Sequence, residues 1–152
     1  MAGQERRLDI PPVYFLSALL LMALLHQVLP LARIFSAPYR YAGIAIMALA
    51  VGLVVWAALL FRRAGTGIVP FSPATALVLA GPYRFTRNPM YLGMAGTLLG
   101  AAILMGSLSP FAVIPAFMAL IAERFIAREE AMLEQAFGQA YVDYKAKVRR
   151  WL

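Results

Sequence analysis

The stretch PMYLGMAGTLLGAAILMGSLSPFAVIPAFMALIAERFI, residues 89–126, decides the fold of this chain. It contains two apolar runs, at about 89–108 and 110–126, and its first charged residue is Glu123. Each run approaches the roughly 20 residues that a helix needs to cross about 30 Å of hydrocarbon. Because the connection between the runs is very short, we expect an antiparallel hairpin of two helices. The residues before the first helix and after the second then lie on the same face of a membrane.

Two more apolar runs, at about 12–34 and 41–61, precede this hairpin. The composition agrees with a membrane protein, since 62% of the residues are apolar, 14% are charged and the mean hydropathy is +0.75. The run 12–34 follows two arginines, but it is too long for the apolar core of a signal peptide, so we expect a retained span. The sequence therefore predicts an all-α, polytopic membrane protein with about four transmembrane helices. We expect a single domain over residues 1–152, which ends in cytoplasmic helices at about 127–151.

The 14 basic residues indicate the orientation of the chain and the class of its partner. They give a formal net charge of +7, yet they form no long tract of the kind that binds nucleic acid. They stand beside apolar runs instead, as expected at the cytoplasmic edge of a bilayer. Only Arg33 and Arg40 fall in the first connection; the others fall in the N-terminal segment, the 62–88 connection and the C-terminal region. The positive-inside rule then places both termini and the 62–88 connection in the cytoplasm.

The chain offers few reactive side chains. It has no cysteine and a single histidine, His26, which excludes disulfides, thiolate catalysis and metal sites built from cysteine or clustered histidine. We therefore expect no metal site. His26 lies within the first apolar run, where a packed or interfacial position and a functional one are both open. Any chemistry must use carboxylates, arginines, tyrosines, amides, backbone groups or a bound cofactor.

The segment GPYRFTRNPMYLG, residues 81–93, leads into the first helix of the hairpin. Pro89 suits the first position of a helix, and Asn88 before it can cap that helix through its side chain. Arg84 and Arg87 stand close to the same helix start. Orphan N–H groups and guanidinium groups together make a natural anion site, although the same arginines can anchor a protein to anionic headgroups. Both interpretations stay open at this point.

A second polar segment, ERFIAREEAMLEQAFG at residues 123–138, follows the hairpin. When it is projected as a regular helix, Glu129 falls at the centre of the apolar arc and Glu130 falls at its border. A carboxylate on the apolar side of a helix near the membrane is costly unless it meets a cation. We therefore expect Glu129 either to pair with Arg84 or Arg87 across the hairpin or to meet a cationic ligand.

These two segments, followed by FGQAYVDYKAKVRRW at residues 137–151, resemble the membrane methyltransferase superfamily. This superfamily includes isoprenylcysteine carboxyl methyltransferases and phospholipid N-methyltransferases, and the resemblance covers about residues 65–151. It implies an integral-membrane enzyme that uses S-adenosylmethionine. The implied acceptor is lipid-like or lipidated, either an isoprenylcysteine-type carboxylate or a phospholipid amine. The implied partners are the lipid bilayer and this acceptor, with the cofactor site in the cytoplasm.

The resemblance also implies which residues surround the cofactor. Glu129, supported by Glu130, would pair its ammonium, and Arg87 or Arg84 would take its carboxylate at the helix start. A tyrosine of the 81–93 segment would pack against the adenine or face the sulfonium. No general base is assigned, and Arg87, Tyr91 and Glu129 are expected to position the reactants. The residues carried over by position are Arg87, Asn88, Pro89, Tyr91, Glu129 and Glu130, with a looser match at Gly65 and Thr66 and with Arg150 near the end of the C-terminal motif. Tyr83 and Arg84 join these candidates for the cofactor site on chemical grounds.

The chain departs from the superfamily pattern at two positions, and the first of them leaves the acceptor open. Asn88 stands where isoprenylcysteine carboxyl methyltransferases commonly have histidine, and the Asn-Pro-Met-Tyr order is more similar to phospholipid methyltransferases and to bacterial relatives of undefined substrate. Arg149 stands where proline is frequent in the C-terminal motif. A hypothesis from another class is a non-catalytic membrane scaffold or assembly subunit, in which the arginines bind anionic lipid and Glu129 forms a structural ion pair. The sequence determines neither the oligomeric state nor the pathway.

Overall fold

Helices make up the regular structure of the computed structural model, which describes residues 10–65 and 75–152. No β-strand occurs within those ranges, so the predicted all-α class is confirmed. The α-helices are α2 (Pro11–Val28), α3 (Ala42–Arg63), α4 (Pro89–Met105), α5 (Val113–Ile121), α6 (Ala127–Phe137) and α7 (Gln139–Lys147). Between them lie the short turns η1 (Tyr39–Tyr41), η2 (Gly81–Arg84) and η3 (Ser109–Ala112) and the π-helical turn η4 (Ala122–Ile126).

Three helical stretches are long and apolar enough to cross a membrane, namely Pro11–Val28, Tyr39–Arg63 and Ser109–Phe137. α4 is apolar as well, and its 17 residues stand at the lower limit of the length that spans a bilayer. The chain is therefore a polytopic membrane protein, as its sequence predicts.

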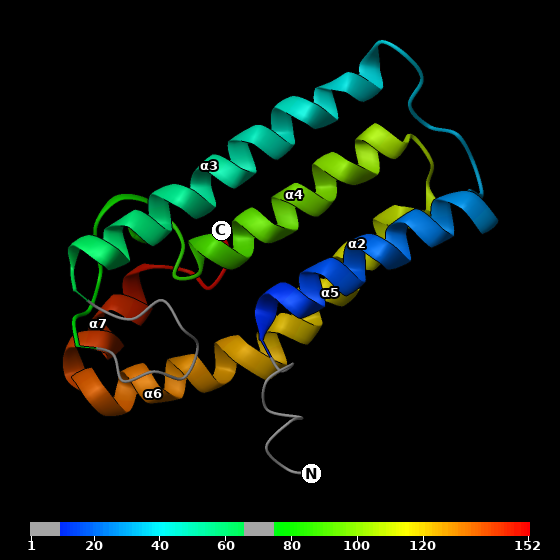
Figure 1. The fold of residues 1–152 in the computed structure, drawn as a ribbon. Helices are drawn as coiled ribbons and strands as arrows, with labels where there is room; N and C mark the ends of the chain where they lie inside the picture. The colour runs from blue at the N-terminus through cyan, green and yellow to red at the C-terminus, as the bar shows by residue number, and fades with distance from the viewer. Residues whose placement is uncertain (1–9, 66–74) are drawn as a thin grey trace.

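Figure 1 shows how the helices are arranged around α4. α3 runs alongside α4 on one side, while α2 and α5 pack on the other. α4 and α5 run antiparallel, so the start of α4 and the end of α5 lie at the same end of the bundle. α6, α7 and the C-terminus lie at that end too (Figure 1). The hairpin thus brings the polar segments 81–93 and 123–138 to one place, as the short connection predicts.

The contact between α3 and α4 is a close approach of two backbones at glycine. A Cβ added at Gly100 would lie 2.6 Å from the carbonyl oxygen of Gly43, and one added at Gly93 would lie 2.8 Å from that of Ala50. Small residues at such contacts let transmembrane helices approach closely. We call this contact, between Gly43 and Ala50 on α3 and Gly93 and Gly100 on α4, the glycine seam.

A separate apolar core joins α4 to α2 and α5. Met22, Leu98 and Ile121 are fully buried in this core. The outer faces of α2 and α3 instead expose large apolar side chains, such as Leu20 and Leu49. Exposed apolar surface of this kind is suited to contact with lipid.

The first helix is shorter than the predicted span, since α2 ends at Val28 rather than near Ile34. Pro30 explains the difference, because a proline biases the residue before it away from helical backbone angles. Leu29 accordingly has φ −141° and ψ 66°. The chain then runs along the connection after α4, where the N–H of Ile34 donates to the Gly106 carbonyl oxygen at 2.8 Å.

His26 lies near the end of α2, at the opposite end of the bundle from α6 and α7 (Figure 1). Its Nδ1 atom is 2.7 Å from Ser107 Oγ, within hydrogen-bonding distance. The structure therefore places this histidine in a contact between the last turn of α2 and the connection after α4, away from the polar segments 81–93 and 123–138.

The last membrane helix continues beyond its predicted end at residue 126. The turn η3, α5, the π-helical turn η4 and α6 form one helical stretch, Ser109–Phe137. A π-helical turn is wider than an α-helical turn and is frequent at functional sites. Because the angle per residue changes across such a turn, a regular helical projection of residues 123–138 does not hold. The predicted C-terminal helices also end early, since Val148 is extended with φ −123° and ψ 131°.

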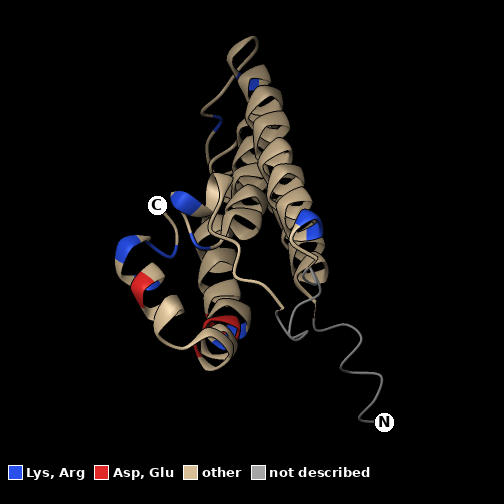
Figure 2. Cartoon of the chain, turned by 90° about the vertical axis from the view of Figure 1, so that its left-hand side faces the viewer, with Lys and Arg blue, Asp and Glu red and all other residues tan. Residues whose placement is uncertain are grey.

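The charged residues are unevenly distributed between the two ends of the bundle. Within the described part of the chain, every acidic residue falls between Glu123 and Asp143. Figure 2 shows that these residues gather at the end formed by α6 and α7, together with most of the basic residues. Arg33 and Arg40 precede α3 at the other end. The cytoplasmic placement of the α6–α7 end stays a prediction from the positive-inside rule.

Candidate functional site

The C-terminal tail, residues 148–152 after α7, holds the start of α4 in place of a side-chain cap. Asn88 occupies the N-cap position before Pro89, but its side chain caps no backbone N–H. Its Nδ2 donates to the Arg150 carbonyl oxygen at 2.9 Å. Thr86 Oγ1 donates to the same oxygen at 3.1 Å and accepts from the Asn88 N–H at 3.2 Å. The predicted capping role of Asn88 is therefore wrong, because its side-chain amide donates to the backbone of the tail instead.

The backbone of the tail also fixes the backbone of Arg87. The Arg87 N–H donates to the Arg149 carbonyl oxygen at 2.9 Å. Beyond these contacts Trp151 packs against the apolar core. The segment before α4 is thus held between the helix that it starts and the last residues of the described chain.

Arg87, Glu130 and Arg150 form the ionic centre of the site. Arg87 Nη2 lies 3.1 Å from Glu130 Oε1, and each of these two side chains is only 9% exposed. Arg150 binds the same carboxylate with two donors, Nε to Oε1 at 3.1 Å and Nη2 to Oε2 at 2.6 Å. These hydrogen bonds to Glu130 raise the pKa of Arg150. One buried carboxylate therefore connects the segment before α4, α6 and the tail.

Glu129 has a different partner from its neighbour. Tyr91 donates its hydroxyl hydrogen to Glu129 Oε1 at 2.7 Å. In the described part of the chain no cationic side chain forms an ion pair with Glu129. Of the two alternatives expected for Glu129, the ion pair with Arg84 or Arg87 is therefore excluded, since Arg87 pairs with Glu130 instead. Arg87 precedes α4 and Tyr91 lies in its first turn, so the contacts of these two residues with α6 are neighbours along the chain.

Arg87 keeps two buried donors without a partner. Its Nε and Nη1 atoms are buried and make no hydrogen bond to any described residue. An unpaired buried donor costs about 1–3 kcal/mol, and native proteins retain few of them. Guanidinium donors are well suited to bind a carboxylate. The site therefore offers unpaired cationic donors at Arg87 and a carboxylate without a cation at Glu129, a pattern complementary to an amino-acid zwitterion.

Four buried tyrosines surround these charges, Tyr83, Tyr91, Tyr141 and Tyr144. Tyr144 donates its hydroxyl hydrogen to the Tyr83 carbonyl oxygen at 2.7 Å, which ties α7 to η2. Burial raises the pKa of Tyr83, and the nearby Tyr144 and Glu129 raise it further. Burial, followed by the charge of Glu130, raises the pKa of Tyr141 to about 12. These phenols therefore stay neutral at physiological pH and form an aromatic wall.

Three predicted site residues do not join this cluster. Arg84 is exposed and lines a separate cleft against α7. Gly65 is also exposed, with φ +66°, and its carbonyl oxygen accepts from Thr75 Oγ1 at 3.1 Å. Thr66 lies outside the described residues. The residues that the structure does bring together are Tyr83, Arg87, Asn88, Pro89, Tyr91, Glu129, Glu130 and Arg150.

Thr86, Tyr141 and Tyr144 also belong to the site, although the motifs in the sequence indicate no role for them. The two tyrosines stand three residues apart, so they share one face of a helix, and this spacing was an available signal. Nothing in the sequence around Thr86 indicates its bond to the tail, because the partner lies 64 residues away.

The same region of the chain matches a known protein family. The family model for phospholipid methyltransferase matches residues 39–140, more than half of the chain. The chain belongs to the phospholipid methyltransferase family. The match runs from η1 into α7 and includes the Arg87–Glu130 and Tyr91–Glu129 contacts, although it stops before Arg150. The superfamily that the sequence motifs resemble is thereby confirmed.

The chain is also similar to a solved methyltransferase and to a short bacterial protein. The structure of the eukaryotic intramembrane Ras methyltransferase, isoprenylcysteine carboxyl methyltransferase, matches with a TM-score of 0.62 and 30% sequence identity. The match covers 72% of this chain and 40% of that one, so this chain spans less than half of that enzyme. An uncharacterised protein of Haemophilus influenzae is 41% identical over 63 residues, which are 41% of this chain and the whole of that protein.

Proposed function

We propose that this chain is a single-domain, integral-membrane methyltransferase that uses S-adenosylmethionine and acts on a lipid-like or lipidated acceptor. Membership of the phospholipid methyltransferase family supports methyl transfer. The choice of S-adenosylmethionine as the methyl donor rests on two groups of the site that lack a polar partner. Arg87 has buried N–H groups without an acceptor, and Glu129 has a carboxylate without a cation.

The residues present fit the amino-acid end of S-adenosylmethionine. Arg87 would hold the carboxylate of this group, and Glu129 would hold its ammonium. The aromatic wall offers Tyr83 and Tyr91 to the adenine or to the sulfonium, since aromatic faces attract both rings and cations. When bound, S-adenosylmethionine supplies a methyl group that is activated for transfer to a nucleophile.

The residues around these two contacts act as positioning residues. Glu130 and Arg150 hold Arg87 in place from one side, and the tail fixes its backbone. Tyr91 holds the carboxylate of Glu129. Alignment of a nucleophile and a methyl group accounts for much of the barrier in such a displacement, so held side chains are the main contribution of the protein. An acceptor that is already an anion or a free amine requires no general base.

The acceptor class is supported by the membrane setting. α2 and α3 expose apolar side chains along their outer faces, so a substrate with acyl or prenyl chains can reach the bundle from the bilayer. The name of the family points to a phospholipid amine, and that of the solved relative points to an isoprenylcysteine carboxylate. Asn88 has no titrating proton, and its amide binds the tail. We place the site on the cytoplasmic side by the positive-inside rule.

Transfer of a radiolabelled methyl group tests this function. Purified wild-type protein is incubated with labelled S-adenosylmethionine and with either a total lipid extract or a membrane-protein extract. We expect label in one of them, and the labelled fraction identifies the acceptor class. The variant Glu129→Gln, which keeps an oxygen to accept from Tyr91, should incorporate far less. If the folded wild-type protein labels neither extract, the methyltransferase proposal fails and the scaffold hypothesis gains support.

A further inference from the structure

The residues proposed to hold the methyl donor are covered by the protein itself. The side chain of Arg87 is only 9% exposed, and its Nε and Nη1 atoms are buried. Tyr83 and Tyr91, the tyrosines offered to the adenine or the sulfonium, are 5% and 7% exposed. A ligand that comes from solution therefore reaches these groups only when a segment that covers them moves.

The membrane helices are not suited to this movement. At the glycine seam the backbones of α3 and α4 meet directly. On the other side of α4, Leu98 and Ile121 are fully buried in the apolar core that α2 and α5 share with it. α6 continues the helical stretch of α5 through η4. Because close-packed interiors resist displacement, the movement falls to the part of the chain after α6.

A single glycine separates α6 from α7 and the tail. α6 ends at Phe137, α7 begins at Gln139, and Gly138 between them has φ +53° and ψ −127°. Glycine adopts such a conformation readily, whereas residues with a Cβ rarely do. No described atom lies within 4 Å of a Cβ added at Gly138, so this glycine serves the backbone angles rather than close packing. Residues at the ends of elements that absorb changes in φ and ψ are typical hinges.

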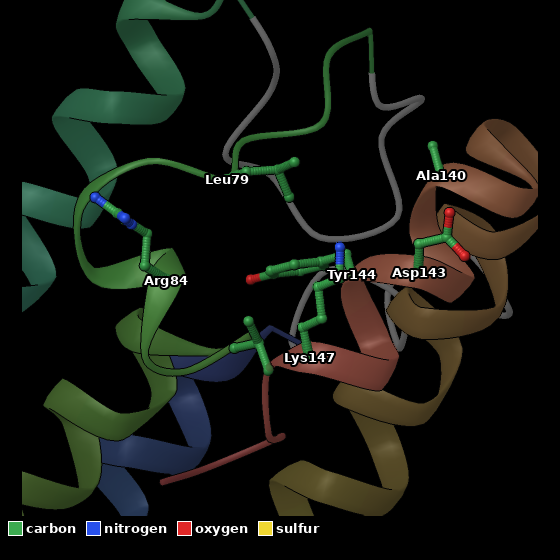
Figure 3. A pocket seen from close by; sticks show the side chains of 7 residues that line it. Leu79, Arg84, Ala140, Asp143, Tyr144 and Lys147 are labelled. Atoms are coloured by element: carbon green, nitrogen blue, oxygen red, sulfur yellow. The ribbon is translucent and has the colours of Figure 1, made fainter.

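Polar contacts hold α7 and the tail against the rest of the protein. Tyr144 donates its hydroxyl hydrogen to the Tyr83 carbonyl oxygen at 2.7 Å, and Arg150 Nη2 donates to Glu130 Oε2 at 2.6 Å. Beside these contacts, a cleft of about 300 Å³ separates part of α7 from the segment before η2 (Figure 3). α7 is therefore attached at separate points and not along its whole length.

The contacts of the tail also fix a residue of the donor site. Arg150 shares the Glu130 carboxylate with Arg87, and the Arg87 N–H donates to the Arg149 carbonyl oxygen. Withdrawal of the tail would free Arg87 on one side and open it to solvent. Trp151 packs against the apolar core, so the closed position has an apolar anchor as well. Closure of the tail and positioning of Arg87 are thus one event.

We propose, building on the proposed methyl transfer, that α7 and the tail, residues 139–152, form a C-terminal lid that turns about Gly138. The lid opens to admit the methyl donor and to release its demethylated product, and the contacts of Arg150 and Trp151 close it. Closure of a lid sequesters a bound reactant from water, and its opening limits turnover in many enzymes. Movement of the lid therefore sets the rate at which the donor is exchanged.

A reversible cross-link across the cleft in Figure 3 tests the proposal. Leu79 and Lys147 are exposed and line this cleft from the segment before η2 and from the lid. The chain has no cysteine, so the variant Leu79→Cys, Lys147→Cys offers a bifunctional thiol reagent two unique sites. The full chain is cross-linked in detergent before S-adenosylhomocysteine is added. We expect the association rate to fall at least about tenfold, because a locked lid does not open, and to recover once a reductant cleaves the link.

The matched control places both cysteines on the lid. Gln139 and Asp143 are exposed and lie one turn apart on α7, where their side chains are hydrogen-bonded at 2.8 Å. In Gln139→Cys, Asp143→Cys the same reagent links two points of the lid and leaves the lid free to turn. The association rate should match that of the wild-type protein.

The opposite change loosens the lid. Trp151→Ala removes the apolar anchor of the tail and should raise the association and dissociation rates of S-adenosylhomocysteine together, each by about fivefold. A role in the shape of the site alone would raise the dissociation rate and leave the association rate unchanged.

Two outcomes of the cross-linking experiment would overturn the lid, namely an unchanged association rate across the cleft and an equal loss in the control pair. If the cross-linking variant does not fold, Trp151→Ala decides, and an unchanged association rate in it overturns the proposal. Failure of the untreated wild-type protein to bind S-adenosylhomocysteine is a different result. It contradicts the proposed methyl transfer, and it is seen before any cross-link is made.

Discussion

The glycine seam lies along α4 and the ionic centre lies at its start, yet the two are stabilised in opposite ways. In the seam, Gly43 and Gly100 allow two backbones to meet, so the contact depends on shape. In the ionic centre, the carboxylate of Glu130 joins Arg87 and Arg150 from different segments. The seam is complete without a ligand, whereas Arg87 is left with two buried donors unpaired. A polar contact that the protein alone does not complete is where a ligand is expected.

The largest expected effect on stability comes from breaking the ionic centre. Glu130→Gln removes the charge that both Arg87 and Arg150 use, and an uncompensated buried charge destabilises a protein by about 3–5 kcal/mol. Thermal unfolding in detergent measures this loss. The matched control is Glu134→Gln, whose salt bridge to Lys145 is exposed and should contribute less than about 1 kcal/mol. Equal stability of the two variants would contradict a structural role for Glu130.

A smaller loss is expected when the glycine seam is overpacked. Gly100→Ala places a methyl group against the Gly43 carbonyl oxygen and Met47, and overpacking of this kind typically costs about 1–3 kcal/mol. Gly52→Ala on the same pair of helices is the control, because no atom lies within 4 Å of its added Cβ. The unfolding temperatures of the two variants in detergent measure this difference in stability. If Gly52→Ala is destabilised as much as Gly100→Ala, the seam is not the cause, because alanine by itself favours a helix over glycine.

The smallest expected effect separates the two glutamates of α6. Tyr91→Phe removes one hydrogen bond to Glu129 and should cost about 1 kcal/mol of stability. It should also weaken binding of S-adenosylhomocysteine about fivefold, because the carboxylate of Glu129 loses its orientation. Calorimetry measures the affinity, with Tyr39→Phe at the exposed far end of the bundle as the control. Wild-type affinity in Tyr91→Phe would exclude a positioning role for this hydroxyl.

The sequence predicts the helices well because their signal is local. Long apolar runs and the short connection near Ser107 are enough to place α4 and α5 in a hairpin. The sequence also locates Arg87, Tyr91 and the glutamate pair, since residue types and order carry the resemblance to the family. It assigns the wrong partners, however. The projection places Glu129 at the centre of the apolar arc, with an ion pair to Arg84 or Arg87 as one of two alternatives, but Glu130 makes the pair with Arg87, and Arg150 of the tail binds it too. The π-helical turn η4 interrupts the regular helix on which a projection depends.

The contacts of the tail could not be predicted either, because they join residues that are far apart in the sequence. Asn88 and Thr86 both bind the carbonyl oxygen of Arg150, more than 60 residues away, and a local rule assigns Asn88 to a helix cap instead. Contacts between backbone carbonyls and distant side chains leave no pattern in a single sequence. The glycine seam could not be predicted for the same reason, because the role of its glycines depends on the packing of α3 against α4.

Calorimetric titration of S-adenosylhomocysteine into wild-type protein and Glu129→Gln, with thermal unfolding of both, tests the central claim most directly. The substitution keeps an oxygen that accepts from Tyr91 and removes only the charge that has no cation. We predict that both proteins unfold at similar temperatures and that the variant binds at least about tenfold more weakly, as expected when a charged hydrogen bond is lost. Equal affinity, or lower stability with full affinity, would contradict the assignment of Glu129 to the ligand.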